Sequence, residues 1–148
     1  MSRHRPSTEL STAFQQTRYL VTHNSGRLTL QVDQPPPPRL QQHSWLVISA
    51  DNPQAQQLPE PANRRRRAAL QELLHPLALP MLPTRHVDAK GLWPDEHGWL
   101  LLLDERATQV GMFEQLHALG RQFGQLALLE FRHAGDDDHN AVIRLLWL

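Results

Sequence analysis

"WLVISADNPQAQQLPEPANRRRRAAL" (Trp45–Leu70) contains the change of character that decides the fold. Its first six residues are apolar or small at every position, which is typical of a central strand covered on both faces. The run ends in Ala-Asp-Asn-Pro, a sequence typical of a turn. A helical pattern then starts near Ala62 and continues to His75, where Pro76 ends it. The stretch therefore predicts a strand that passes through a polar turn into a helix.

The remaining elements follow on both sides of this unit. Upstream, two β-rich runs predict a hairpin (17–23 and 27–32), and a proline-rich segment predicts a stiff connection (33–43). Downstream, the pattern predicts an extended segment, a doubly apolar strand, a second helix and two last strands (78–87, 98–104, 108–123, 125–131 and 141–148). A polar turn is expected between the last two strands, at 132–140.

From Trp45 onward the order is β-α-β-β-α-β followed by one more strand, which is the split βαβ pattern of ferredoxin-like folds. We therefore expect an α+β protein with a mixed, mostly antiparallel sheet and a ferredoxin-like βαββαβ core. An N-terminal β-hairpin and a C-terminal extra strand would extend the sheet, with two helices on one face. Residues 1–10 are polar and predict a flexible N-terminal tail, and residues 11–148 a single α+β domain.

Composition limits the class of protein. The 15 Lys and Arg residues balance the 15 Asp and Glu residues, so a nucleic-acid or anionic-membrane protein, which normally has a basic excess, is not expected. The chain contains no cysteine, which excludes disulfides and thiolate chemistry. No apolar run approaches the roughly 18 residues of a membrane span. We expect a soluble cytoplasmic protein.

The first helix has an apolar stripe of four leucines, Leu70, Leu73, Leu74 and Leu77. At about 100° per residue, Asn63 and Arg66 fall within this stripe, and Arg67 lies at its margin. Arg64 and Arg65 point away from it. The four consecutive arginines are therefore two features, a solvated pair and a pair directed toward the sheet.

An arginine on the core side of a helix needs a partner, because an unpaired buried charge is very costly. One interpretation is an internal ion pair of Arg66 with Asp51 or Glu60 that fixes the connection between strand and helix. The other is an anion or small polar ligand held by Asp51, Asn52, the helix N-terminal N–H groups and one or two arginines. Both interpretations stay open from the sequence.

The second helix ends in a tight turn into the next strand. Gly120 lies within its apolar face, and Gly124 follows one turn later. This turn brings Arg121 and Gln125 together, and a helix C-cap with an arginine favourable to the dipole is the simpler interpretation for Arg121.

Three stretches, "ISADNP" (48–53), "ANRRRRAAL" (62–70) and "LGRQFGQLALLEF" (119–131), resemble an uncharacterised bacterial family catalogued as domain of unknown function 3293. The resemblance runs from about Phe14 to the carboxyl end. The family's motif positions are occupied here by Thr17, Asn52, Pro53, Asn63, Arg66, Glu96, Gly120, Arg121, Gly124, Gln125 and Ala127.

The resemblance implies the fold, a bacterial origin and a cytoplasmic location, and it implies no activity. This chain departs from the family's pattern at three positions. Ser49 stands where threonine is usual, Asp51 where tryptophan or another large residue is frequent, and Leu126 where asparagine is common. If a ligand pocket of the family used that aromatic residue or that asparagine, this member would bind differently.

Other chemistry is weakly indicated. The nine histidines form no short ligand pair, and the acidic run between His133 and His139 is typical of a turn, so we expect no metal and no cofactor. Glu96 could be one half of an acid–base pair, but no nucleophile or catalytic motif is visible.

Three hypotheses result. The first is a small protein that binds a small anionic or phosphate-bearing ligand at the first strand–helix junction, with Asp51, Asn52, Asn63, Arg66, Arg67, Glu96, Arg121 and Gln125 as site residues. The second is a structural or interaction module, in which the same residues form an internal network and the C-terminal strand mediates assembly, for example into a homo-oligomer. The third is an enzyme that uses Glu96 and Arg66.

Overall fold

The strand expected at 45–50 is β3 (Ser44–Ser49) in the computed structural model, and all its residues are buried. The structure describes residues 7–24, 26–133 and 141–148. Side chains of β3 alternate between two apolar clusters. Leu46 and Ile48 pack on one face of the sheet, and Trp45 and Val47 on the other. The doubly apolar pattern arises because both faces of the strand are covered.

Seven strands form one sheet in the order β2-β1-β4-β5-β3-β6-β7. Their bounds are β1 Arg18–His23, β2 Gly26–Leu30, β4 Met81–Val87, β5 Glu96–Leu103, β6 Ala127–Phe131 and β7 Arg144–Trp147. β3 and β4 are joined through a helix and separated in the sheet by β5, as the split βαβ pattern requires. The α+β class is confirmed, and every strand pairing in the described part of the chain is antiparallel.

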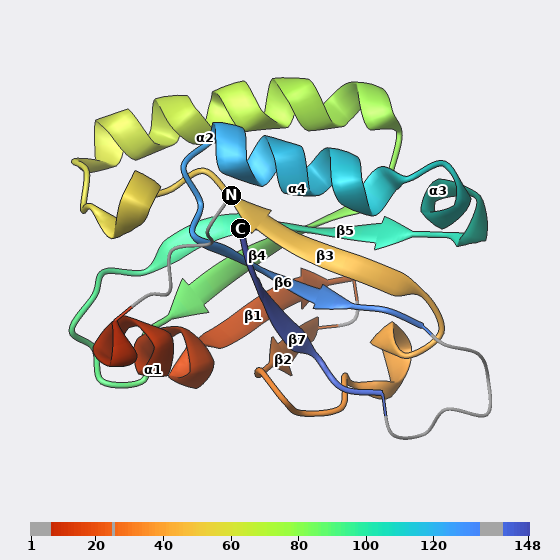
Figure 1. Ribbon diagram of the computed structural model, residues 1–148, viewed down its shortest axis with the longest axis horizontal. Helices are drawn as coiled ribbons and strands as arrows, with labels where there is room; N and C mark the ends of the chain where they lie inside the picture. Colours follow the sequence, from red (N-terminus) through yellow and green to blue (C-terminus); the bar gives the residue numbers. More distant parts are fainter. Residues whose placement is uncertain (1–6, 25, 134–140) are drawn as a thin grey trace.

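Two long helices, α2 (Glu60–Leu74) and α4 (Met112–Gln122), lie over the same face of the sheet (Figure 1). α2 contacts this face through Leu70 and Leu74, which are buried, whereas Leu73 is 43% exposed and does not belong to the stripe. α4 contributes Phe113 and Leu116. The two helices and the apolar side chains beneath them form the larger core.

The single helix expected over 108–123 is wrong at its start. A short helix, α3 (Glu105–Gln109), begins after Asp104, whose side chain accepts a hydrogen bond from the Ala107 N–H (2.8 Å). Gly111 then adopts a left-handed conformation (φ 76°), and α4 begins at Met112. A glycine with positive φ ends the first helix and redirects the chain into the second.

The other face of the sheet carries a helix that the sequence did not suggest. α1 (Thr8–Gln16) begins after Ser7, which accepts a hydrogen bond from the Leu10 N–H (3.2 Å). Its Phe14 ring packs edge-on against Trp147 of β7, with 5.2 Å between ring centroids. The flexible tail expected at 1–10 therefore overlaps a helix that begins at Thr8.

The proline-rich segment also packs on this face, where Leu40 is buried in the same cluster as Trp45. It includes the 3₁₀ turn η1 (Pro38–Leu40), and the Trp45 Nε1–H donates to the Leu40 carbonyl (2.9 Å). Two further 3₁₀ turns are η2 (Pro53–Ala55) and η3 (His75–Leu77). The polar turn expected at 132–140 lies for the most part outside the described residues. No helix within the described ranges is long and apolar enough to cross a membrane.

Candidate functional site

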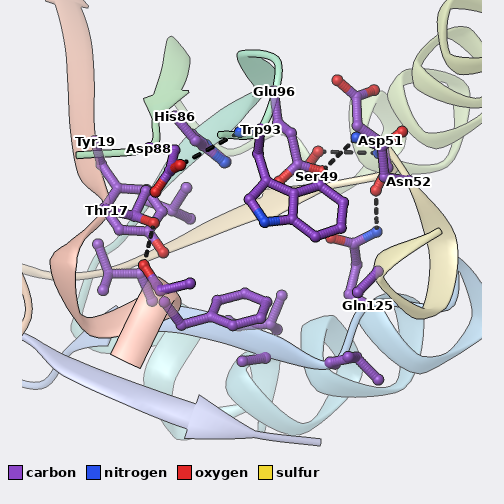
Figure 2. Close-up of a pocket in the computed structure, with 18 of the residues that line it drawn as sticks. Thr17, Tyr19, Ser49, Asp51, Asn52, His86, Asp88, Trp93, Glu96 and Gln125 are labelled. Atoms are coloured by element: carbon purple, nitrogen blue, oxygen red, sulfur yellow. Dashed lines mark hydrogen bonds between the residues drawn. The ribbon is translucent and has the colours of Figure 1, made fainter. Parts of the chain in front are cut away.

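A cavity of about 90 Å³ lies against the face of the sheet that α1 covers (Figure 2). A cavity whose volume is roughly 10–15 Å³ on the same measure holds one water molecule, so this cavity is large enough for a small organic group. Phe14 of α1 and Trp93 of the connection between β4 and β5 contribute aromatic rings to its lining. Figure 2 shows the Trp93 indole between Tyr19 and His86 on one side and Asn52 and Gln125 on the other.

A row of polar side chains crosses the sheet at the cavity. In the strand register, Tyr19 lies opposite His86, and His86 lies opposite Glu96. Residues directly opposite in an antiparallel sheet point to the same face, so these three side chains lie side by side. Extending the β3–β5 register by two residues brings Asp51 opposite Glu96, and extending the β3–β6 register by four residues brings it opposite Gln125. All five residues line the cavity.

Burial keeps two of these groups neutral. The pKa of His86 falls to about 3, chiefly because of burial and to a lesser extent because of the charge of His97. Burial also raises the pKa of Tyr19, and the neighbouring Glu96 adds to the effect. The two rings stack at a tilt, 4.8 Å between centroids. At neutral pH this end of the row is an imidazole and a phenol without charge.

Glu96 behaves differently. Burial raises the pKa of this carboxyl to about 7, against the lowering effect of a hydrogen bond from Asn52, and Asp51 adds a smaller rise. That bond joins Asn52 Nδ2 to Glu96 Oε2 at 3.0 Å. Oε1 has no hydrogen-bond partner among residues 7–24, 26–133 and 141–148. Glu96 thus offers one carboxylate oxygen to an occupant of the cavity and changes charge near neutral pH.

Asn52 is held by a reciprocal pair of hydrogen bonds with Asn63. The Asn52 N–H donates to Asn63 Oδ1 (2.9 Å), and Asn63 Nδ2 donates to Asn52 Oδ1 (2.8 Å). The backbone of Asn52 is left-handed (φ 50°), a conformation that asparagine tolerates better than most residues. Both side chains are buried. The pair fixes the path from β3 into α2, so Asn63 serves the connection and does not reach the cavity.

The ion pair expected for Arg66 is wrong. Arg66 donates from Nε to the Ala50 carbonyl (2.8 Å) and from a terminal nitrogen to the Phe123 carbonyl. It therefore ties α2 to the ends of β3 and α4 through two backbone carbonyl oxygens.

Arg67 makes the ion pairs instead. It donates to Asp51 Oδ2 at 2.8 Å and also contacts the Glu60 carboxylate. Asp51 Oδ2 accepts a second bond, from the His97 N–H (2.9 Å). Burial nevertheless raises the pKa of Asp51. Both arginines directed toward the sheet are occupied by protein groups, and neither lines the cavity.

The turn from α4 into β6 closes the same corner. Gln125 Nε2 donates to the Asp51 carbonyl (3.1 Å), and the Gln54 N–H donates to the Gly124 carbonyl (2.8 Å). Gly124 has φ 71°, and a Cβ there would lie 2.7 Å from Pro53 Cβ. Glycine is required at this close approach. Arg121 is exposed in the last turn of α4 and is not a lining residue.

The eight residues expected at the site therefore divide into three groups. Asp51, Asn52, Glu96 and Gln125 line the cavity, Asn63, Arg66 and Arg67 build the strand–helix connection, and Arg121 lies on the surface. Sequence reasoning missed the lining residues Phe14, Tyr19, His86 and Trp93. The alternation of β1 and β4 marks Tyr19 and His86 as members of one face, but only the strand register brings them beside Glu96.

Metal binding finds no support in the part of the chain that the structure describes, where no three of His, Asp and Glu come together as a set of ligands. The aspartates and His139 of the acidic run lie outside the described residues.

Fold and site define a ferredoxin-like α+β protein with a half-polar cavity on the face opposite its two long helices. The chain belongs to the family described as protein of unknown function (DUF3293), whose model matches residues 48–128. No curated protein matches the chain. No solved structure matches it either. Several residues that carry the family resemblance line the cavity, namely Thr17, Asn52, Glu96, Gln125 and Ala127.

Proposed function

We propose that this protein binds a small organic molecule in the cavity between α1, the β4–β5 connection and the sheet. The observation that carries the proposal is Glu96, a mostly buried carboxyl with one oxygen held by Asn52 and the other available beside aromatic rings. A concave, largely apolar pocket with a few convergent polar groups is the usual form of a small-molecule site. A perturbed pKa in such a pocket strengthens the assignment.

The proposal moves the ligand away from the arginines. A small anionic ligand was expected at the strand–helix junction because Arg66 and Arg67 were available to bind it. Arg66 is bound to two carbonyl groups, and Arg67 to two carboxylates. An anion at the junction would have to displace these partners, whereas an occupant of the cavity displaces none of them.

An internal network, as in the structural hypothesis, accounts for Asn63, Arg66 and Arg67 but gives no reason for the cavity. Assembly through the C-terminal strand stays a prediction. β7 is the last strand in the sheet order, and Trp147 is half-buried against Phe14 of the same chain. Bacterial origin and cytoplasmic location also stay predictions.

Catalysis by Glu96 is a second candidate. A carboxyl whose pKa lies near 7 is suited to act as a general base or acid, because it exchanges a proton readily at neutral pH. Arg66, the partner expected for it, is engaged elsewhere and does not line the cavity. A reaction at this site would therefore depend on Glu96 with Asn52, and proton transfer is the chemistry these groups support.

The test is a thermal-shift screen of neutral, cationic and anionic metabolites with two matched variants of α1. Ala13 lines the cavity, and Ala13→Phe would fill part of it. Thr12 is its exposed neighbour, so Thr12→Phe adds the same ring outside. A ligand of the cavity should raise the melting temperature of the wild type and of Thr12→Phe but not of Ala13→Phe. A ligand that stabilises all three equally binds elsewhere, and a screen without hits would remove the proposal.

A further inference from the structure

The lining of the cavity has an unbalanced charge. Asp51, Asp88 and Glu96 contribute carboxyl groups, and neither arginine nor lysine is present among the lining residues that the structure describes. The Asp88 carboxylate is already engaged, because its Oδ2 accepts hydrogen bonds from the N–H groups of Leu92 (2.7 Å) and Trp93 (3.3 Å). Asp51 also keeps one oxygen without a partner, the buried Oδ1, but its Oδ2 is paired with Arg67 and accepts the His97 N–H. Glu96 is the lining carboxyl held by a single hydrogen bond, that from Asn52.

The groups that face Glu96 do not neutralise it. β1 presents the phenol of Tyr19, β4 the imidazole of His86, and the end of β3 the acid Asp51. Arg67 in this corner is paired with Asp51 and Glu60. A buried carboxylate with no cation opposite it is costly. A positively charged occupant would supply the missing counter-charge.

Aromatic rings complete the requirement. Phe14, Tyr19 and Trp93 reach the cavity from α1, β1 and the β4–β5 connection. The faces of such rings attract cations, and tryptophan does so most strongly. Rings on several sides together with a carboxylate form the arrangement that recognises alkylated ammonium groups, whereas a phosphate or carboxylate ligand would meet like charge here.

We infer that the occupant of this cavity is a small organic cation, an ammonium or methylated ammonium group seated against Glu96 and the ring of Trp93. The inference rests on the proposed function, since it names the ligand class of the same pocket. In this arrangement the Glu96 carboxylate supplies the negative charge that pairs with the cation, and the Trp93 ring forms one wall of the binding site.

Proton release is a consequence of this arrangement. Near pH 6.5, roughly half or more of the Glu96 carboxyl groups carry a proton before binding, since the pKa is about 7. A bound cation favours the ionised form, so a proton must leave as the ligand enters. The affinity for a cation should therefore rise between about pH 5.5 and about pH 8.

The experiment uses charge-matched probes. Choline is compared with dimethylbutanol, its uncharged carbon isostere, and with dimethylbutyrate, an anion of similar shape. Isothermal titration calorimetry on the full chain measures each affinity, and buffers of different ionisation enthalpy report the proton released. The variants are Glu96→Gln, which keeps an acceptor for Asn52, and Glu72→Gln on the exposed side of α2 as the control.

Wild type and Glu72→Gln should bind choline at least about tenfold more tightly than dimethylbutanol, and Glu96→Gln should lose that preference and the proton release. Equal binding of choline and dimethylbutanol, or tighter binding of dimethylbutyrate, overturns the cation inference. If the binding of dimethylbutanol or dimethylbutyrate is lost in Ala13→Phe, the ligand occupies the cavity, and the proposed function holds although the cation inference does not. No measurable binding of choline to the wild type likewise overturns the inference, whereas the proposed function falls only if the wider metabolite screen fails as well.

Discussion

Glu96→Gln should change how the stability of this protein depends on pH. In the unfolded chain the pKa of Glu96 has its ordinary value of 4.5, and in the folded protein it is about 7. Between these values the folded state keeps a proton that the unfolded chain releases, so the contribution of Glu96 to stability is fully present below about pH 4.5 and is lost as the pH rises through about 7. Gln accepts the same hydrogen bond from Asn52 without ionising.

The magnitude follows from the two pKa values. Each unit of difference corresponds to about 1.36 kcal/mol, and the difference of about 2.5 sets a limit of about 3.4 kcal/mol. Over the range from about pH 5 to about pH 8, where the protein can be handled, about 2.5 kcal/mol of this effect should appear. Over this pH range, the free energy of unfolding of Glu96→Gln minus that of the wild type should therefore increase by about 2.5 kcal/mol.

Urea denaturation at a series of pH values measures the effect, with Glu72→Gln as the control. Glu72 is exposed on α2, so its replacement should leave the pH dependence of the wild type unchanged. Taking the difference between each variant and the wild type cancels the titration of all other groups. If the difference for Glu96→Gln varies by less than about 0.5 kcal/mol over the range, the carboxyl ionises freely and the argument for a desolvated site is refuted.

Three further substitutions test the corner beside the cavity by the same denaturation assay. Asn63→Ala leaves a buried N–H without its acceptor and should cost about 2–4 kcal/mol, whereas Arg64→Ala on the exposed side of the same helix should cost less than about 0.5 kcal/mol. Arg67→Met removes the cation from a buried carboxylate and should cost about 3 kcal/mol at neutral pH, with a smaller loss near pH 4; equal stability to Arg64→Met would contradict the ion pair. Gly124→Ala and Gly91→Ala both place alanine at positive φ and should each lose about 1 kcal/mol, but only Gly124→Ala meets a neighbouring side chain, so it should be the less stable by at least about 1 kcal/mol.

The fold could be predicted because the hydrophobic pattern of each core element indicates which of its faces are buried. A strand that is apolar at every position must be covered by other elements on both faces of the sheet, and β3 is buried on both faces. The elements that escaped prediction depend on tertiary contacts. α1 shows no buried residue of its own and is held on the sheet by contacts such as that of Phe14 with Trp147, which no local pattern reveals.

The site was predictable in part for the same reason. Helical periodicity correctly directed Asn63, Arg66 and Arg67 toward the sheet, but it could not choose their partners. The carboxylate partners expected for Arg66 bind its neighbour Arg67, one position further around the helix, and Arg66 binds backbone carbonyl groups instead. Tyr19 and His86 are far apart along the chain, and pairing between β1 and β4 alone makes them neighbours. Contacts set by strand register lie outside what periodicity can reveal.

The structural and the binding interpretations of this corner are connected through one side chain. Asn52 Oδ1 accepts hydrogen bonds from Asn63 Nδ2 and from the Leu58 N–H (2.9 Å). Both bonds require an acceptor, so the orientation of the amide is fixed and its Nδ2 must face the other way. There it donates to Glu96 Oε2. This bond occupies one carboxylate oxygen and fixes the orientation of the carboxyl group, and with it the position of Oε1. The network that secures α2 to β3 thereby positions the carboxyl of the cavity. A stable junction is therefore what a binding site at Glu96 requires, and loss of Asn63 should weaken ligand binding even where the protein stays folded.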